Sequence, residues 1–564
     1  MVAAGLLALS TFFMLALGAP IYDALHVHDA RAAAPAGYKA SAAADPSEVL
    51  SLRIALKTDT SALVQKLMDV STPGSKDYRN FLSKAQMEKL TAPSAVGTKA
   101  VKAWLKKNGI TATPGATKQW LNIQVPVAQA NEMLGADFTV YENKDTGISA
   151  VRTLAYSLPK SVKPFVDFIY PATAFPVQST RGIATTHTAG SFRNTTVARR
   201  AGTADPACAE AITPQCLQAL YNIPTEPATQ SSNTMVVSSF VDSFASKADL
   251  STFLSDFRPD ISRDISFDVT SLNGGENDES NPSTEGSLDI QYTVGIATEV
   301  PTTFFTVGSG DGGDLTGFLD LVNELLSQDN PPTVFTTSFG FPEELVPEDV
   351  ANNICDAYAQ LGARGTSIFF SSGDSGVDDG QSSTCTTFRP TFPSGCPFVT
   401  VVGATQGVSP DIAADFSSGG FSNYFTQPDY QQDAVGSYLS KLGDLNAGLF
   451  NTGGRGFPDV SAVGVAYQVR IAGEVQPVFG TSASTPLFAS IVALLNDRLI
   501  ADGQAPMGFL NPMLYSSGLT ALDDVVQGSN PGCGTDGFPA DQGWDPVTGL
   551  GTPDFDKFVT LLGL

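Results

Sequence analysis

A serine follows a glycine at the point where an apolar helix is expected to begin. The segment FGTSASTP, residues 479–486, contains Ser482 and precedes the apolar helical run LFASIVALLNDRL. A serine in such a turn exposes its Oγ, and the N–H groups at a helix N-terminus favour negative charge. Nucleophiles for acyl transfer are often mounted in this way. The structural alternative is that Ser482 or Ser484 only caps the helix, so a nucleophilic role requires a base.

The histidine count limits what that base can be. The chain contains three histidines, His26, His28 and His187, and none lies between residues 206 and 564. A Ser–His–Asp triad built within that region is therefore excluded. No HExxH motif is present, and no cysteine stands in a sequence context typical of catalysis. A base for Ser482 must be a lysine, an aspartate or a glutamate.

Two carboxylates are spaced to project from one face of a helix. An Asn-Pro turn and a capping residue, Ser283 or Thr284, precede an apolar run that predicts a helix. Glu285 and Asp289 stand at positions i and i+4 of that helix, about 6 Å apart at Cβ. Carboxyl groups so placed can share a proton and titrate as a coupled pair. The alternative is a solvated acidic helix face.

A third acidic residue follows an apolar strand. Asp374 lies in the glycine-containing bend SSGDSG, directly after the stretch TSIFF. A protonated Asp374 could donate a hydrogen bond to a developing oxyanion, as a buried carboxylic acid can. Taken alone, the residue could equally be an ordinary turn aspartate.

The elements that must position these residues indicate an α/β domain from about residue 206 onward. Apolar strands such as TMVVSSF, TVFTTSFG and TSIFF alternate with helical stretches such as 313–328 and 346–363. Near-continuous apolar strands separated by helices predict a parallel, doubly wound sheet. Sites in such sheets form beyond the C-terminal ends of the strands, which is where Asp374 is expected.

Two segments of different composition precede this domain. Residues 45–176 alternate strand-like and helix-like stretches and predict a compact antiparallel α+β unit. Residues 177–205 are small, polar and rich in Thr, Gly and Ala, which is typical of a linker. Exposed linkers are common sites of proteolysis, so we interpret this one as a processing site, with an ordinary tether as the alternative.

The acidic charge balance excludes two classes of partner. The 564-residue chain carries a formal charge of −25 at pH 7, with 57 acidic and 32 basic residues. Such a surface repels nucleic acid and anionic lipid, so we expect neither nucleic acid nor a membrane as a partner. Free carboxylates have pKa values of about 4, so much of the charge disappears near pH 3–5. The surface suits an acidic milieu, although it also fits plain solubility.

Several features predict secretion. Residues 1–19 have the apolar length and small terminal residues of a signal peptide, and no stop-transfer segment follows. Six cysteines without a CxxC spacing indicate disulfides rather than a metal cluster. Cys208 and Cys216 are expected to pair, and the other four allow three arrangements. Asn194 begins one N-glycosylation sequon.

Taken together, STEGSLDIQY, SSGDSG and FGTSASTP resemble the motifs of the sedolisin family, the serine-carboxyl peptidases. The resemblance covers nearly the whole chain and implies a subtilisin-like fold in which a glutamate replaces the catalytic histidine. It implies that Ser482 is the nucleophile and Glu285 the general base. Asp289 is then the carboxylate that orients and proton-couples to that base, and Asp374 the oxyanion-hole acid.

The same resemblance implies one structural Ca²⁺ site in the irregular C-terminal stretch. Hard oxygen ligands on an irregular loop are what Ca²⁺ requires. The implied ligands are the side-chain carboxylates of Asp524 and Asp545 and the backbone carbonyls of Val525, Asp541 and Gly543.

The domain organisation implied by the resemblance has a ferredoxin-like α+β propeptide that inhibits the enzyme. We expect a signal peptide at 1–19, an inhibitory propeptide domain at 20–176, a processing linker at 177–205, and a peptidase domain at 206–564 with its calcium loop at about 520–556. The precursor should process itself and act outside the cell as a monomer.

The expected function is acid hydrolysis of protein and peptide substrates through an acyl-enzyme. Resemblance to fungal members of the family favours release of N-terminal tripeptides. An acid endopeptidase of the same family is the first alternative. The others are a catalytically inactive, calcium-stabilised secreted binding protein and a neutral subtilisin-like protease, which the histidine count opposes.

Overall fold

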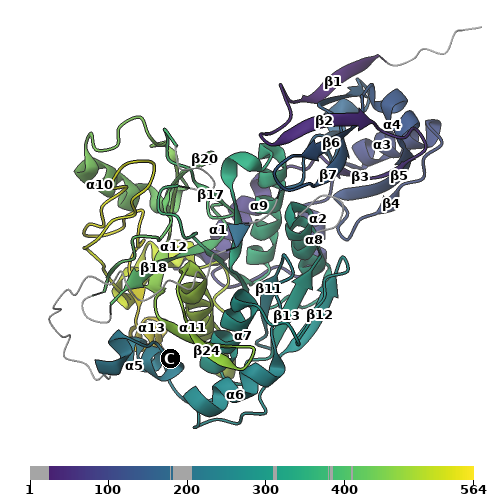
Figure 1. Cartoon of the computed structure of the whole chain (residues 1–564). Coiled ribbons are helices and arrows are strands. Elements are labelled where there is room, and N and C mark those ends of the chain that lie inside the picture. The colour runs from purple at the N-terminus through teal and green to yellow at the C-terminus, as the bar shows by residue number, and fades with distance from the viewer. Residues whose placement is uncertain are drawn as a thin grey trace, which may run out of the picture.

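The computed structural model describes residues 24–177, 180–181, 206–308, 314–378, 380, 385–407 and 411–564. The predicted signal peptide, His187, the sequon at Asn194 and most of the predicted linker lie outside the described residues. Figure 1 shows an N-terminal domain packed against a larger C-terminal domain.

A mostly parallel sheet forms the centre of the C-terminal domain. Its strands lie in the order β12, β13, β11, β14, β16, β18, with β22 and β19 also pairing with β18. All of these pairs are parallel except β18 with β19. Every residue of β11, β14 and β16 is buried, which explains their continuous apolar sequences. The strands are β11 (Met235–Ser239), β12 (Asp268–Leu272), β13 (Thr302–Val307), β14 (Val334–Thr337), β16 (Ser367–Ser371), β18 (Thr400–Gln406), β19 (Ile412–Ala413) and β22 (Val460–Val463).

Helices cover both faces of this sheet, as a doubly wound fold requires. The helices α7 (Thr284–Ile296) and α11 (Thr481–Ala501) pack against each other and share one apolar core with α6 (Lys247–Phe257). Helices α8 (Asp314–Ser327) and α9 (Glu348–Ala363) belong to a second core. Nearly every residue of α7 and α11 is buried, because both helices lie inside the domain, and in α7 this burial includes Glu285 and Asp289. The predicted fold class is confirmed.

Smaller elements complete the C-terminal domain around its sheet. Two of them, β15 and β17, pair antiparallel beside the C-terminal ends of the central strands. The elements are α5 (Pro214–Tyr221), β15 (Phe339–Pro342), β17 (Thr391–Phe392), β20 (Gly420–Thr426), α10 (Gln432–Leu442), β21 (Gly454–Phe457), β23 (Tyr467–Ile471), β24 (Glu474–Val478), α12 (Asn511–Leu514), β25 (Leu522–Asp523), β26 (Thr552–Pro553) and α13 (Phe555–Leu562).

The N-terminal domain is the antiparallel α+β unit that the sequence predicts. Its main sheet has the strand order β4, β5, β3, β9. Of two smaller sheets, one has the order β2, β6, β7 and the other pairs β1 with β8. None of the helices among the described residues is long and apolar enough to cross a membrane. The elements are β1 (Leu25–Ala30), β2 (Tyr38–Ala43), β3 (Val49–Leu56), α1 (Ser61–Ser71), α2 (Lys84–Leu90), α3 (Ala95–Lys107), β4 (Thr113–Pro114), β5 (Trp120–Pro126), α4 (Val127–Leu134), β6 (Thr139–Asn143), β7 (Ser149–Arg152), β8 (Ala155–Pro159) and β9 (Val166–Tyr170).

The two domains share apolar cores across their contact. Trp120, Phe168 and Tyr170 of the N-terminal domain belong to the same core as the residues of α8 and α9. Helix α1 also packs on α9. Arg53 adds an ion pair in which its guanidinium donates to both carboxylate oxygens of Asp320 on α8. In Figure 1 the N-terminal domain accordingly lies beside α8 and α9.

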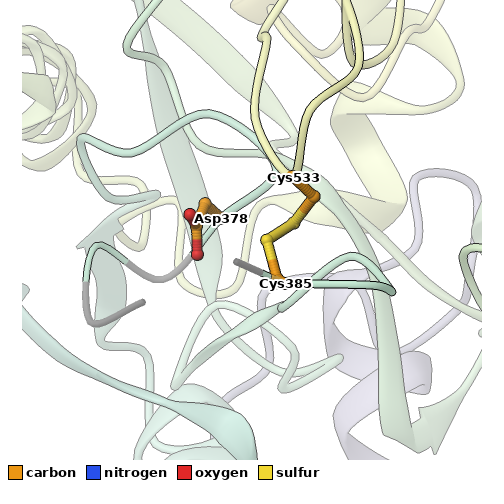
Figure 2. A group of neighbouring side chains, drawn as sticks. All are labelled: Asp378, Cys385 and Cys533. Atoms are coloured by element: carbon orange, nitrogen blue, oxygen red, sulfur yellow. A yellow bond between two sulfur atoms is a disulfide. The ribbon is translucent and has the colours of Figure 1, made fainter. Parts of the chain in front are cut away.

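Three disulfides use all six cysteines. Cys208 pairs with Cys216 as expected, and the other bonds join Cys355 to Cys396 and Cys385 to Cys533. Asp378 lies beside the third bond, with its carboxylate within 4.8 Å of both sulfur atoms (Figure 2). Because those sulfurs are bonded to each other, they are not metal ligands.

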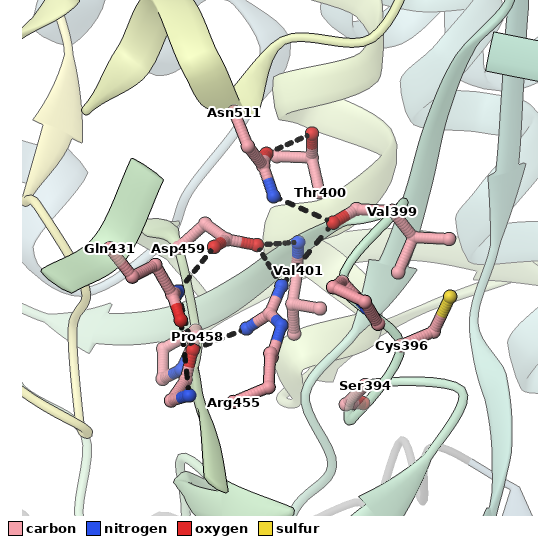
Figure 3. Close-up of polar contacts among 12 residues, drawn as sticks. Ser394, Cys396, Val399, Thr400, Val401, Gln431, Arg455, Pro458, Asp459 and Asn511 are labelled. Carbon is pink, nitrogen blue, oxygen red and sulfur yellow. Dashed lines mark hydrogen bonds and ion pairs between the residues drawn. The ribbon is translucent and has the colours of Figure 1, made fainter. Parts of the chain in front are cut away.

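A buried ion pair fastens the end of the sheet to the loops around it. Arg455 and Asp459 are both fully buried, and Nη2 of Arg455 lies 2.5 Å from Oδ2 of Asp459 (Figure 3). The same carboxylate accepts hydrogen bonds from the backbone N–H of Val401 at 2.8 Å and the Tyr515 hydroxyl at 2.9 Å. Gln431 adds a longer bond of 3.3 Å. The pair therefore joins β18, β21 and the segment after α12.

Substitution of Asp459 by asparagine should strongly destabilise the protein. The change leaves Arg455 charged and buried, which costs about 3–5 kcal/mol in the free energy of unfolding. Urea unfolding of the full chain measures this loss. Asp256→Asn is the matched control, because it breaks a surface ion pair with Arg470 and should cost less than about 1 kcal/mol. Equal losses in the two variants would contradict the expectation.

Candidate active site

The start of α7 brings Glu285 and Asp289 into the protein interior. The Ser283 side chain caps the helix by accepting a hydrogen bond from the Gly286 N–H, and the Ser283 N–H donates to the Phe244 carbonyl at 2.9 Å. A Cβ on Gly286 would lie 2.4 Å from that carbonyl oxygen, so the close contact requires glycine. Glu285 and Asp289 are 4% and 2% exposed. They do not form a solvated acidic face.

Burial favours the protonated form of both carboxyl groups. It raises the pKa of Asp289 to about 8 and holds the pKa of Glu285 well above its usual value. The negative charge of Asp289 raises the pKa of Glu285 further. The Ser338 hydroxyl opposes this effect, because it donates a 2.8 Å hydrogen bond to Oδ1 of Asp289. The pair therefore retains a proton under acidic conditions.

Ser482 lies in the first turn of α11, next to the Glu285 carboxyl. It is fully buried, and its Oγ makes no hydrogen bond with the described residues. Both carboxyl oxygens of Glu285 are likewise buried and without a hydrogen-bond partner. The Ser482 hydroxyl nevertheless lies close enough to lower the pKa of Glu285 by favouring its ionised form. Unpartnered polar atoms are uncommon in protein interiors, and several of them lie together here, so we treat this position as a candidate functional site.

Asp374 approaches the same turn from the end of β16. Its Oδ1 accepts hydrogen bonds from the N–H and the hydroxyl of Thr481, both at 2.7 Å. Its Oδ2 is buried and has no partner among the described residues. Burial raises the pKa of Asp374 to about 6, although the Thr481 hydrogen bonds favour the ionised form.

The backbone at Gly480 permits this approach. Gly480 has φ +145°, in the region that favours glycine, and a Cβ there would lie 2.7 Å from Oδ2 of Asp374. Gly480 also occupies the N-cap of α11 without capping the helix through a side chain. Of the first N–H groups of the helix, that of Thr481 donates to Asp374 and that of Ala483 donates to the Gly480 carbonyl at 3.0 Å.

The structure brings all four residues predicted for catalysis together at one edge of the sheet. Asp374 follows β16, and Glu285, Asp289 and Ser482 come from the packed helices α7 and α11. Of the histidines, His26 and His28 lie in β1 of the N-terminal domain. The C-terminal domain, from residue 206 onward, has no histidine in its sequence that could replace Glu285.

Sequence reasoning missed two hydroxyl residues of this site. Ser338 directly follows β14 and holds Asp289, while Thr481 precedes Ser482 and holds Asp374. Thr481 could have been found because it lies within the FGTSASTP motif. Nothing in the strand sequence distinguishes Ser338 from other strand-end serines.

The residues of the predicted calcium site also lie together. The Gly543 N–H donates to Oδ2 of Asp524 at 2.9 Å, and the Asp541 N–H donates to Oδ2 of Asp545 at 3.1 Å. The Val525 carbonyl lies beside Thr548, whose hydroxyl also contacts Asp545. The two carboxylates thus converge on one short backbone segment.

This donor set fits a hard divalent cation. Asp545 is fully buried, and burial raises its pKa to about 8. Lys441 is the nearest described cation, but it contacts Asp541 and Gln542 at the exposed side of the loop. The donors are all carboxylate or carbonyl oxygens on an irregular loop, which suits Ca²⁺ rather than a thiolate- or imidazole-binding metal.

Comparison with known proteins agrees with this architecture. Residues 36–175 match the family described as "Pro-kumamolisin, activation domain", and residues 269–502 match the subtilase family. The chain has the fold of Pseudomonas sedolisin, a serine-carboxyl proteinase, with a TM-score of 0.51 and 23% identity over 63% of this chain and 98% of that one. Together these matches define a subtilisin-like serine peptidase with an activation domain.

Relatives at higher identity identify the family. The chain is 34% identical to tripeptidyl-peptidase SED2 of Arthroderma otae over 94% of both chains. It is 36% identical to the probable tripeptidyl-peptidase SED3 of Arthroderma benhamiae over 90% of this chain and 91% of the relative. The chain belongs to the sedolisin family of serine-carboxyl peptidases, with the fungal tripeptidyl-peptidases.

Proposed function

We propose that this protein is the precursor of a secreted acid peptidase in which Ser482 is the nucleophile and Glu285 the general base. One observation carries the proposal: the Ser482 hydroxyl, both oxygens of Glu285 and Oδ2 of Asp374 are buried together, and no described residue forms a hydrogen bond with any of them. Buried polar atoms of this kind require a hydrogen-bonding partner. A bound peptide group would supply one as the Ser482 hydroxyl approaches its carbonyl carbon.

The proposed reaction passes through an acyl-enzyme. Glu285 takes the proton from Ser482 as its Oγ attacks the peptide carbonyl carbon, and then gives that proton to the leaving amine. Asp289 shares charge and proton with Glu285, and Ser338 holds Asp289 in place. The neutral Asp374 carboxyl donates to the oxyanion from Oδ2. Water then attacks the acyl-enzyme with Glu285 again acting as the base.

This chemistry requires acid. A carboxylate is a weak base, and general acid–base catalysis is most efficient where the pKa of the catalyst lies close to the ambient pH. Asp374 can donate only while it is protonated, and its pKa is about 6. Its protonated form therefore dominates below pH 6 and is lost as the pH rises through that value.

The proposed products are tripeptides released from peptide N-termini. The support is that the relatives SED2 and SED3, which match this chain over 90% or more of its length, are tripeptidyl-peptidases by name. An endopeptidase of the same family remains the alternative outcome.

We also propose that the N-terminal domain keeps the enzyme inactive. It shares an apolar core with α8 and α9, and the chain that leaves it forms the short strand β10 (Thr180–Arg181). This strand pairs antiparallel with β15, which directly follows Ser338. A substrate backbone would need the same edge, so cleavage in the 177–205 linker should free the site.

A structural Ca²⁺ is the last part of the proposal. Asp524, Val525, Asp541, Gly543 and Asp545 would hold it, and its chemistry would be charge compensation for the buried Asp545 carboxylate. It takes no part in the proposed reaction.

Glu285→Gln should abolish turnover while the protein still folds. Loss of the base should lower kcat by about 10²–10⁴-fold.

Ser482→Ala should leave the precursor full-length at pH 4, when assayed by gel electrophoresis. The parent enzyme should lose activity about tenfold per pH unit above about pH 6, as Asp374 ionises. The exposed Glu276→Gln is the matched control and should behave like the parent. A Glu285→Gln enzyme as fast as the parent, or a rate maximum at pH 7 or above, would overturn the mechanism.

Release of tripeptides can be tested with one peptide in two forms. The peptide with a free N-terminus should lose successive tripeptides, detected by mass spectrometry, whereas the N-acetylated form should resist digestion. Internal cleavage of both forms at equal rates would show that the enzyme is an endopeptidase.

Removal of Ca²⁺ should lower the melting temperature of the full chain. A site saturated about 100-fold above its Kd contributes about 2.7 kcal/mol, which corresponds to roughly 2 °C for a chain of this size. Asp545→Asn should remove the response to added Ca²⁺, and the exposed Asp444→Asn should keep it. An identical melting temperature with Ca²⁺ and with EDTA would exclude a structural ion.

A further inference from the structure

We propose that Thr481 is a positioning residue that fixes which oxygen of Asp374 carries the acidic proton. The inference rests on the proposed role of Asp374 as the oxyanion acid. It adds a residue that donates nothing to the substrate but decides where the donated proton lies.

The hydrogen bonds around Thr481 leave one arrangement of protons. The Gly373 N–H donates to the Thr481 hydroxyl oxygen at 3.2 Å, so the hydroxyl hydrogen is free to point at Asp374. The hydroxyl and the backbone N–H of Thr481 both reach Oδ1 at 2.7 Å. An oxygen that accepts two hydrogen bonds is the carbonyl-like oxygen of a neutral carboxyl group. The proton of neutral Asp374 therefore resides on Oδ2.

Oδ2 is the oxygen that can reach a substrate. It is buried and has no hydrogen-bond partner in the described part of the chain, and it lies against Gly480, where any side chain would collide with it. Thr481 stands between Gly480 and Ser482 in the chain. Asp374 is therefore held by the residue that directly precedes Ser482 in the same helix turn. The position of Asp374 relative to Ser482 consequently does not depend on the longer loops around them.

The same contacts make Thr481 a determinant of the pH range. Its hydrogen bonds stabilise the ionised form of Asp374 and so oppose the rise in pKa caused by burial. Among the described residues, the titratable groups that face Asp374 are the carboxyl of Glu285 and, beyond it, Asp289. Both are acidic, so neither supplies a positive charge that would stabilise ionised Asp374. Removal of that hydroxyl should raise the pKa of Asp374 and leave Oδ1 held by the Thr481 N–H alone.

The experiment measures kcat and KM against pH for Thr481→Val. We expect kcat to fall about ten- to hundredfold with KM almost unchanged, less than the loss of a complete oxyanion donor. The alkaline limb of the kcat profile should move up by roughly one pH unit, because one hydrogen bond to a charged group is lost. Thr481→Ser keeps the hydroxyl and should restore the position of the limb.

The matched control is Thr485→Val, one turn further along α11. The Thr485 hydroxyl is equally buried but donates to the Thr481 carbonyl at 2.7 Å, so its loss should not move the limb. Melting temperatures identify a variant that fails to fold, and Thr481→Ala, which cannot clash, then replaces the valine. The inference would be overturned if the alkaline limb of the Thr481→Val profile lay at the same pH as in the parent enzyme. It would also be overturned if Thr485→Val shifted that limb equally.

Asp374→Asn separates this inference from the proposed function. A fully active Asp374→Asn enzyme would remove the proposed role of Asp374 itself. An inactive Asp374→Asn enzyme combined with an unshifted Thr481→Val profile would refute the role of Thr481 alone.

Discussion

Three buried carboxyl groups meet beside one serine hydroxyl, and none of the groups that shift their pKa values is a cation. An unpaired buried carboxylate is costly, so these groups hold protons more tightly than carboxyls in water. The carboxyl groups of this site therefore keep their protons under acidic conditions, whereas a histidine-based site gains and loses its proton near neutral pH. Every other feature of the site serves to keep Glu285, Asp289 and Asp374 dry and correctly oriented.

The fold meets this requirement with hydroxyls and glycines rather than with charge. Ser338 and Thr481 each donate to one carboxyl oxygen, which orients the group without fully ionising it. Gly286 and Gly480 let backbone and carboxyl approach at distances that a side chain would prevent. The parallel sheet supplies the common edge, since Ser338 and Asp374 follow the neighbouring strands β14 and β16.

The sequence reveals the groups proposed to react but only part of what surrounds them. The spacing of Glu285 and Asp289 and the glycine turn before Ser482 predict helix ends, and α7 and α11 begin there. The burial of Glu285 and Asp289 was not predictable from that spacing, because an acidic pair at positions i and i+4 is equally compatible with a solvent-exposed helix face. The partner of Asp289 lies 49 residues away, and the Cys385–Cys533 bond spans 148 residues. Such contacts depend on the packing of whole elements, which local patterns do not encode.

The contact between the domains has a consequence for how long the enzyme survives. Trp120, Phe168 and Tyr170 complete an apolar core to which α8 and α9 contribute, so the larger domain gains part of its stability from the smaller one. An enzyme separated from that domain would have lost the template on which its helices packed. Its persistence in acid would then rest on a slow rate of unfolding rather than on equilibrium, and denaturation would be a one-way event.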